Sequence, residues 1–530
     1  MLTGPIKKIF IAAATTLLFA SCAKDLDRKP FYSATSATVY NDFSNYKLIL
    51  AKIYAGLAVS GQQGPAGKPD ISGLDEGFSN YLRQYWTAQE TSTDEAIIAW
   101  NEGDLPDYHK MNWSTSNTWV TAMYNRIYYE VGVCNEFIRE TTDEKLKARG
   151  IKGSDLEQAK QFRAEARFMR ALSYAHAIDM FGSVPFVTEK DAVGSFLPKQ
   201  IARKDLFKYV EDELLSMEAE LVDARKNEYG RVDKACVWTL LAKLYLNAEV
   251  YTGEKKYSEV IPWCNKIIAA GYSLEPDYRN LFNTGNNESK EFIFPVCYDG
   301  LRTKTWGGMT FLIHAAVGGS MNPANFGING GWYGLRTTKS FVNLFADVSG
   351  NTDKRALFYT SGQNIEINDQ FTFTDGYAIQ KFRNVSAAGV AGSDPTGNYP
   401  DTDFPLFRLA DVYLMYAEAV VRGGTGGSAA DALLYVNKLR ERAYGNSMGD
   451  IVEHDLTLDF ILNERGRELY WEGYRRTDLI RFGKYTGDNY LWAWKGGIKN
   501  GRAVEDYRVL FPLPSSDIMA NPSLVQNNGY

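Results

Sequence analysis

The sequence of 530 residues is poor in the side chains that most often bind metals. It has only four histidines, His109, His176, His314 and His454, and no two of them have the spacing of a metal-binding pair. This scarcity argues against a zinc or iron centre built from histidines. The chain also lacks a GxSxG elbow, a Cys and His constellation and a phosphate-binding loop, so no motif supports acyl transfer or nucleotide hydrolysis.

Cysteine and positive charge are also scarce. The five cysteines include no close CxxC pair. Cys236 and Cys264 fall in neighbouring predicted helices, where they could form a disulfide or remain buried thiols. Lys and Arg number 58 against 64 Asp and Glu, which gives a net charge of −6. Without a basic excess to attract a phosphate backbone, we expect no nucleic-acid partner.

The N-terminus has the features of a bacterial lipoprotein signal. Two lysines precede an apolar run at 9–20, which is too short to span a bilayer of roughly 30 Å as a helix. Residues 19–22 read Phe-Ala-Ser-Cys and resemble a lipobox, so we expect residues 1–21 to be removed and Cys22 to carry acyl chains such as palmitate. An ordinary signal peptide with a coincidental cysteine is the alternative. Lipid alone would then anchor the protein, and Lys24-Asp25 resembles the signals that direct such lipoproteins to the surface of the outer membrane.

Most of the chain has the periodicity of α-helices. Apolar residues recur three or four positions apart from about 40 to 272 and again from about 401 to 484. Clear stripes predict helices at 155–182, 205–221, 234–248, 257–270, 406–421, 429–444 and 456–472. Small residues such as Ala242 alternate with Trp238 and Tyr245, which we expect in the core between antiparallel helices like those of tetratricopeptide repeats. The sequence therefore predicts a mostly α protein with a helical scaffold.

Residues 273–400 form a different kind of segment between the two helical blocks. Glycine, asparagine, threonine and aromatic residues dominate it, and only short β-like runs remain, at 292–297 and 371–374. We predict a long, loop-rich and partly β insertion, packed on the scaffold within a single body that spans 22–530. Because loops on a rigid scaffold often carry function, the insertion is a natural place for a binding site.

The unusual feature of the composition is its 14% of aromatic residues, which include 11 tryptophans. Trp306 and Trp332 each stand beside glycines in loop sequence, and neither belongs to a helical stripe. Glycines leave the face of an indole uncovered, and a flat apolar face matches the C–H face of a pyranose ring. Trp100 is more ambiguous, because it ends an apolar run. Packing of all three indoles beneath long loops is the alternative.

Catalysis by paired carboxylates is the alternative function. A glycoside hydrolase needs two acids about 5 to 10 Å apart. Acidic residues stand close together in loop-like sequence at 75–76, 94–95, 102 and 104. With 64 acidic residues some such groups arise by chance, and no flanking sequence marks one of them as an acid with a raised pKa. We therefore expect that the protein is not an enzyme.

Several segments in order along nearly the whole chain resemble one family. They are Ala-Glu-Ala-Arg-Phe-Met-Arg-Ala at 164–171, Phe-Gly-Ser-Val-Pro at 181–185, Gly-Arg-Val-Asp-Lys-Ala at 230–235, Phe-Arg-Leu-Ala-Asp-Val-Tyr-Leu at 407–414, Asn-Glu-Arg-Gly-Arg-Glu-Leu at 463–469 and Phe-Pro-Leu-Pro at 511–514. Together they resemble the SusD/RagB family of outer-membrane lipoproteins. The resemblance implies a tetratricopeptide-like scaffold that captures nutrients, usually glycans, beside a SusC-like TonB-dependent transporter.

Within this family the resemblance is strongest to a starch-binding member. It implies that Trp100, Trp306 and Trp332 occupy the aromatic positions of a glucan-binding arc, with Asp75 and Arg83 at two polar positions. Trp306 would replace a tyrosine and keep a stacking face. An arc of rings suits the helical curvature of an α-1,4-glucan, so we expect a starch-like ligand. A different polysaccharide or a peptide is the alternative within the same family.

The resemblance also implies the loss of one hydrogen-bonding side chain and the presence of one calcium site. Gly103 stands where the starch-binding member has asparagine, which removes a hydrogen-bonding side chain, and neighbouring Asn101 is the candidate substitute. Residues 399–403 read Tyr-Pro-Asp-Thr-Asp and resemble a calcium-binding segment, with Asp401 and Asp403 as ligands of a structural calcium ion. Solvated loop acids are the alternative. We expect no other cofactor.

Overall fold

The computed structural model describes residues 36–194 and 196–530. The predicted signal segment and the predicted lipid site at Cys22 lie outside the described residues. The chain divides into two compact units, Met1–Tyr46 and Lys47–Tyr530. In the first unit, α2 (Ser36–Val39) precedes the start of α3 (Ser44–Ala58), which continues into the second unit.

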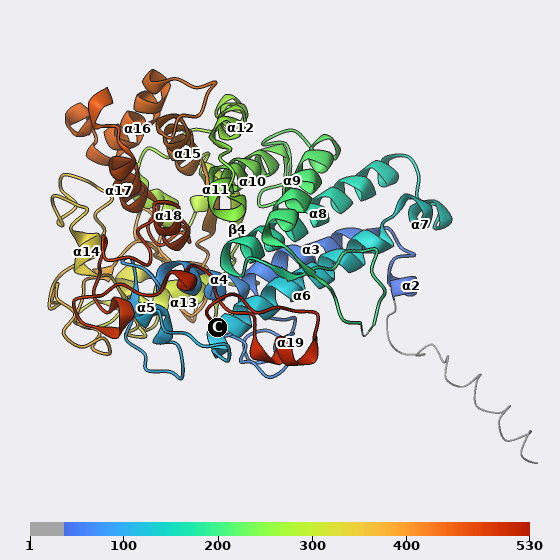
Figure 1. Cartoon of the computed structure of the whole chain (residues 1–530), viewed down its shortest axis with the longest axis horizontal. Helices are drawn as coiled ribbons and strands as arrows, with labels where there is room; N and C mark the ends of the chain where they lie inside the picture. The colour runs from blue at the N-terminus through green and yellow to red at the C-terminus, as the bar shows by residue number, and fades with distance from the viewer. Residues whose placement is uncertain (1–35, 195) are drawn as a thin grey trace, which may run out of the picture. The chain divides into compact units, whose positions relative to one another are not determined.

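The second unit is mainly helical (Figure 1). Its longer helices are α4 (Tyr81–Glu90), α6 (Thr118–Glu140), α8 (Ser154–Met180), α9 (Arg203–Met217), α10 (Lys234–Leu246), α12 (Tyr257–Ala269), α15 (Leu409–Val421), α16 (Ala429–Tyr444) and α17 (Leu458–Leu469). Its shorter helices are α5 (Asp107–Lys110), α7 (Asp143–Ala148), α11 (Ala248–Thr252), α13 (Gly308–Ala315), α14 (Lys339–Val342), α18 (Arg475–Arg481) and α19 (Ser515–Ala520). Each predicted helix agrees with one of these to within four residues at either end, so the prediction of a mostly α scaffold is confirmed.

Helices that follow one another in the chain pack together. α6 packs against α8, α8 against α9, and α10 against α12. α12 packs against α15, and α15 against α16, although the loop-rich insertion separates α12 from α15 in the sequence. Stacked helix pairs of this kind bury a continuous core, as in tetratricopeptide-like scaffolds.

Side chains of one family-like segment begin a helix and tie it to another. The Asp233 carboxylate accepts hydrogen bonds from the backbone N–H groups of Ala235 and Cys236, and so caps the start of α10. Two residues earlier, Arg231 forms an ion pair of 2.5 Å with Glu165 of α8. The segment at 230–235 therefore has a structural role in the scaffold.

The strands are short and form two-stranded antiparallel sheets. They pair β1 (Ile97–Ile98) with β5 (Leu335–Arg336), β2 (Val184–Pro185) with β3 (Gln200–Ile201), β4 (Phe292–Val296) with β8 (Phe404–Arg408), and β6 (Phe358–Tyr359) with β7 (Ala378–Ile379). The predicted run at 292–297 is therefore a strand. The predicted run at 371–374 is not, because hydrogen bonds from Thr372 N–H to the Asp369 carbonyl and from Asp375 N–H to the Thr372 carbonyl fold it into turns.

Two further parts of the secondary structure differ from the prediction. The apolar run at 406–421 begins inside β8, and α15 starts only at Leu409. A short run that is buried on both faces does not distinguish a strand from a helix. Residues 308–315 form α13 rather than a loop. All residues of α13 are buried, so the helix lacks the polar face that produces a visible stripe.

A buried network of ion pairs joins the second helical block to the insertion. Arg408 lies 2.8 Å from Glu291, 2.7 Å from Glu468 and 2.6 Å from Glu472, and none of these side chains is exposed. Arg442 bonds both Glu291 and Glu468. Burial of a charge is costly unless the charge is paired. Arg408 and Glu468 both belong to family-like segments, so these segments hold the fold together rather than contact a ligand.

The predictions for single core residues have mixed outcomes. Tyr245 is buried as predicted. Trp238 is only half-buried, because its indole nitrogen reaches the helix surface and donates to the Glu218 carboxylate over 2.6 Å. Cys236 and Cys264 are buried free thiols, so the disulfide alternative is wrong.

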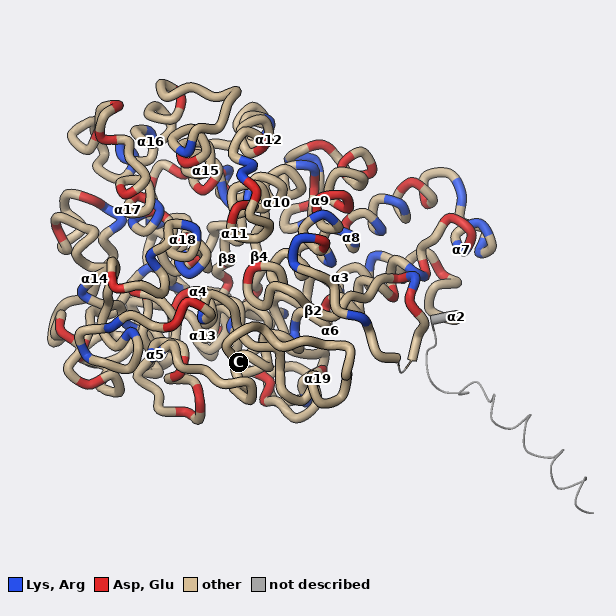
Figure 2. The backbone as a smooth tube through the Cα atoms, viewed as in Figure 1, with Lys and Arg blue, Asp and Glu red and all other residues tan. Residues whose placement is uncertain are grey.

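The charged residues of the second unit are of mixed sign along the chain. Lysine and arginine alternate with aspartate and glutamate over the helices in the view of Figure 2.

Among the described residues, no helix has both the length and the apolar composition needed to cross a bilayer.

Candidate functional site

The fold brings the three predicted tryptophans together. Trp100 follows β1 and Trp332 precedes β5, and these strands pair with Ile98 opposite Leu335, so both indoles lie at the same end of one small sheet. The ring centroids of Trp100 and Trp332 are 6.4 Å apart, and those of Trp332 and Trp306 are 6.2 Å apart. All three indoles are half-buried. We call these three residues the aromatic arc.

Helix α13 fixes two of the three rings. Trp306 lies just before its first turn, and the loop that carries Trp332 is bonded to its last turn. The backbone N–H of Trp332 donates to the His314 carbonyl over 2.8 Å, and that of Gly334 donates to the Ala315 carbonyl over 2.8 Å. The helix that the sequence pattern did not reveal is therefore the element that positions the insertion's part of the site.

Glycines allow the indoles to approach the backbone closely. A Cβ on Gly334 would lie 2.8 Å from the Trp100 ring, and a Cβ on Gly77 would lie 2.7 Å from the Cβ of Trp306. Real Cβ atoms do not approach other atoms this closely, so a larger residue would displace either ring. Gly334 thus allows close packing against the Trp100 ring, and Gly77 allows close packing against the Cβ and backbone of Trp306, while both indoles stay half-buried.

Three residues near the arc were not expected from the sequence. The Tyr399 ring lies 5.3 Å from Trp306 at 47°, and the His314 ring stacks on Trp332 at 4.8 Å. The buried Glu76 carboxylate accepts a hydrogen bond of 2.9 Å from the backbone N–H of Trp306, and its burial raises its pKa. These contacts join segments far apart in the sequence, so no local signal identifies them. Tyr399 was expected only as part of a calcium segment, and Glu76 only among the candidate acids of a hydrolase.

Arg83 lies against the arc without an acidic partner. It belongs to α4, and its guanidinium lies 4.4 Å from the ring of Phe311, 5.3 Å from Trp119 and 5.9 Å from Trp100. Burial lowers the pKa of Arg83 to about 10, so it remains charged at neutral pH. Within the described part of the chain, its guanidinium forms no ion pair, and its Nε has no hydrogen-bond partner. Its terminal nitrogens are free to donate to a ligand.

The other predicted polar residues lie on exposed loops. Asp75 is exposed, and one of its carboxylate oxygens accepts a hydrogen bond of 3.1 Å from the backbone N–H of Phe78. Asn101 is exposed and directly follows Trp100. Gly103 has a φ of 52°, and a Cβ at this position would meet no atom within 4 Å. The space left by the missing asparagine side chain is therefore open to solvent.

Most of the acidic groups considered for a hydrolase form ion pairs or hydrogen bonds that stabilise the fold. Asp94 is fully buried in an ion pair of 2.7 Å with Arg475. Buried Glu95 accepts a hydrogen bond from the backbone N–H of Trp471 over 3.0 Å. Asp104 accepts a hydrogen bond of 2.5 Å from the backbone N–H of Thr118 at the start of α6. Residues in such contacts are not free to protonate a glycosidic oxygen.

The two aspartates proposed as calcium ligands accept hydrogen bonds from different partners. Asp401 accepts from the backbone N–H groups of Gly300 and Ser393. Buried Asp403 accepts from the Tyr298 backbone N–H and the Tyr229 hydroxyl, and burial raises its pKa to about 6. No group of three or more His, Cys, Asp or Glu side chains that could hold a metal ion occurs among the residues that the structure describes. The donor set thus fits hydrogen bonding better than calcium, which stays a prediction.

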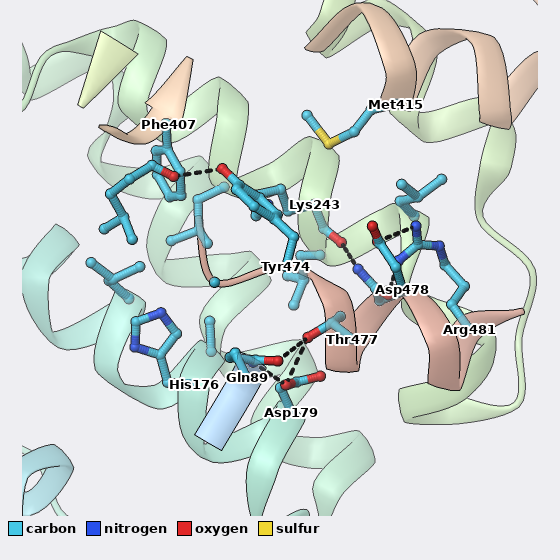
Figure 3. Close-up of a pocket in the computed structure, with 18 of the residues that line it drawn as sticks. Gln89, His176, Asp179, Lys243, Phe407, Met415, Tyr474, Thr477, Asp478 and Arg481 are labelled. Carbon is cyan, nitrogen blue, oxygen red and sulfur yellow. Dashed lines mark hydrogen bonds and ion pairs between the residues drawn. The ribbon is translucent and has the colours of Figure 1, made fainter. Parts of the chain in front are cut away.

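A separate cavity of about 60 Å³ lies within the helical scaffold (Figure 3). The Asp179 carboxylate at its wall accepts hydrogen bonds from the Gln89 amide and the Thr477 hydroxyl, and Arg481 pairs with Asp478 at 2.7 Å. Burial lowers the pKa of His176 to about 3, so this wall residue is neutral. Since these charged groups satisfy one another, the cavity suits a few water molecules. The aromatic arc, in contrast, is half-exposed and keeps an unpaired cation.

Comparison with known proteins identifies relatives of the whole chain. A model of the SusD family matches residues 329–530. The starch-binding protein SusD of Bacteroides thetaiotaomicron is 35% identical over 582 residues, and the match covers 100% of both chains. A SusD-like protein of Bacteroides ovatus is 24% identical over 98% of this chain and 97% of its own.

Solved structures share the fold. A SusD superfamily protein of Bacteroides thetaiotaomicron aligns with a TM-score of 0.70 at 21% identity, over 92% of this chain and 99% of the other. Surface glycan-binding protein A of the same organism, in complex with laminarihexaose, aligns with a TM-score of 0.68 at 20% identity over the same shares of the two chains. These neighbours confirm the predicted helical architecture.

Proposed function

Because the chain belongs to the SusD family, we propose that it captures starch-like α-glucans and delivers them to a SusC-like TonB-dependent transporter in the outer membrane. The assignment rests on 35% identity to SusD over the full length of both chains. Proteins of this family bind carbohydrate and are not enzymes, which confirms the expectation of binding without catalysis.

The observation that carries the choice of ligand is the inclination of the three indoles. The planes of Trp100 and Trp332 meet at 43°, and those of Trp332 and Trp306 at 52°. Rings inclined in this way present a curved surface, whereas a flat β-linked glucan would require nearly coplanar rings. An α-1,4-glucan curls along its length, so successive sugars can each lie against one ring.

Polar groups at the edge of the arc suit a neutral, hydroxyl-rich ligand. The terminal nitrogens of Arg83 can donate to sugar hydroxyls, and the exposed side chains of Asp75 and Asn101 can bond them from the neighbouring loops. The proposal gives these residues the task of fixing the sugar's orientation while the indoles supply most of the contact area.

Attachment to the membrane is the second part of the proposal. Lipid on Cys22 would hold the protein at the outward-facing surface of the outer membrane, beside the transporter. Two or more acyl chains on one residue give stable anchoring, since each buried methylene contributes roughly 0.8 kcal/mol.

Electrophoresis through native gels that contain a polysaccharide tests the ligand. The body that begins after Cys22 would be run through gels with amylopectin, levan, xylan or no addition. We expect amylopectin alone to retard it. Retardation only by another polysaccharide would keep the glycan-binding role and overturn the α-glucan preference. Equal migration in every gel would contradict polysaccharide capture.

A further inference from the structure

Tyr333 follows the last ring of the arc in the chain and has an unusual backbone. Its φ is 55°, in the left-handed region that glycine and asparagine tolerate best. A bulky aromatic residue is strained in this region. Burial does not compensate for the strain, because 54% of the Tyr333 surface is exposed. In contrast, Trp471 and Met111 also have positive φ angles, but both are buried in the core.

The Tyr333 ring packs against neighbouring residues on one side. A Cβ on Gly318 would lie 2.7 Å from the Tyr333 ring and 2.9 Å from the Phe373 ring, so the ring rests on a residue without a side chain. Phe373 contacts it edge to face, with centroids 5.7 Å apart at 68°. The Tyr333 backbone N–H is held by the Val317 carbonyl over 3.0 Å. The ring is thus fixed in place although it is exposed.

Polar groups lie beside this ring. A Cβ on Gly319 would have both the Gln363 amide and the Phe373 ring within 4 Å, so these residues form one surface. The Gln363 amide nitrogen, correctly oriented, donates to the Gly376 and Phe373 carbonyls, so the amide oxygen takes the position nearer to Gly319. Exposed Ser320 lies next along the chain, with its hydroxyl 2.9 Å from that of Tyr359.

We propose that Tyr333 is a fourth sugar-stacking residue, which binds the part of a longer glucan chain that extends beyond Trp332. The inference rests on the proposed function. A held, exposed ring with hydroxyl and amide groups beside it has the composition of a sugar subsite. Stability alone would favour glycine or asparagine at this backbone conformation. The tyrosine therefore has a role other than packing.

The test is calorimetric titration of the full-length mature protein with maltotriose and with maltoheptaose. We expect Tyr333→Asn to weaken maltoheptaose binding by about 2- to 12-fold, the usual effect of losing one aromatic contact. Maltotriose affinity should not change, because a trisaccharide is long enough only for the arc. Tyr333→Phe should retain the maltoheptaose affinity, since it keeps the ring.

Thermal denaturation and Trp332→Ala complete the design. Tyr333→Asn should melt at or above the wild-type temperature, because asparagine relieves the backbone strain, so a loss of affinity would not reflect unfolding. Unchanged maltoheptaose affinity in Tyr333→Asn, together with a large loss in Trp332→Ala, would overturn this inference and leave the proposed function standing. A wild-type protein that bound neither sugar would overturn both.

Discussion

The indole nitrogen of Trp100 donates a hydrogen bond of 2.9 Å to the main-chain carbonyl of Trp332. The bond joins residues 232 positions apart in the sequence. It fixes the edge of one ring of the arc to the backbone that carries the next. Rings held in this way lose little conformational freedom when a sugar binds, so more of the contact energy contributes to affinity.

Trp332→Ala should weaken α-glucan binding by about 5- to 150-fold, because truncation of an interface aromatic costs roughly 1 to 3 kcal/mol. The helical circular dichroism should not change, since Trp332 lies in a loop and not in the scaffold. Trp263→Ala is the matched control, because Trp263 is also half-buried but belongs to α12. Equal affinities of the two variants for maltoheptaose would contradict the site.

Gly103→Asn should strengthen glucan binding. Asparagine tolerates the φ of 52° at this position, and its Cβ would enter open space three residues after Trp100 in the chain. One new neutral hydrogen bond contributes about 0.5 to 1.5 kcal/mol, which corresponds to an increase of about 2- to 12-fold in affinity. Both Gly103→Asn and Gly103→Ala would be titrated with maltoheptaose. The alanine variant separates the effect of the asparagine amide from the effect of replacing glycine in the backbone. A gain in both variants would exclude the amide as its cause.

Arg83→Met should lower glucan affinity without lowering stability. The Arg83 guanidinium is buried among rings without an acidic partner, and replacement of a buried charge by an apolar side chain of similar size is often neutral or stabilising. Binding should fall because the hydrogen bonds to sugar hydroxyls are lost. The measurements are urea denaturation and maltoheptaose titration.

Arg126→Met on neighbouring α6 provides the contrast. The buried Arg126 guanidinium bonds Asp70 at 2.8 Å and the Ser79 carbonyl, so its replacement leaves these groups without partners and should destabilise the fold. If Arg83→Met destabilised the protein as much as Arg126→Met, Arg83 would be a structural residue rather than a ligand-binding one.

Sequence patterns pointed to residues of the candidate site more readily than to their arrangement. Trp306 and Trp332 could be found because their glycine-rich surroundings are local. Glu76, His314 and Tyr399 could not, because each reaches the arc only through contacts between distant segments. The family-like motifs are informative for a different reason, since residues such as Arg408 are buried in ion pairs that any chain with this fold needs.

Secondary structure was predictable where one face of an element meets water. The long helix α8 shows its stripe clearly. All residues of α13 and β8 are buried. Their apolar runs therefore show no periodicity that distinguishes a helix from a strand. Since α13 positions Trp306 and Trp332, a helix without a visible sequence pattern builds this part of the candidate site.

Glu90 should make the fold less stable as the pH rises through neutrality. Glu90 and Glu95 are buried side by side, and burial raises the pKa of Glu90 to about 7 and that of Glu95 well above its usual value. In the unfolded chain both titrate near 4.5. Between these two pH values the folded state holds a proton that the unfolded state has lost, so stability falls as the pH rises from about 4.5 to 7.

Glu90→Gln removes this titration. Its amide oxygen can still accept from the backbone N–H groups of Gly473 and Tyr474, which Glu90 now holds in the turn before α18. We expect similar melting temperatures for the variant and the wild type at pH 4.5, and a higher one for the variant at pH 8. Parallel curves of melting temperature against pH would show that Glu90 does not titrate in this range. Because Glu95 lies two residues before β1, and Trp100 two residues after it, weaker glucan binding by the wild type at pH 8 should accompany the loss of stability.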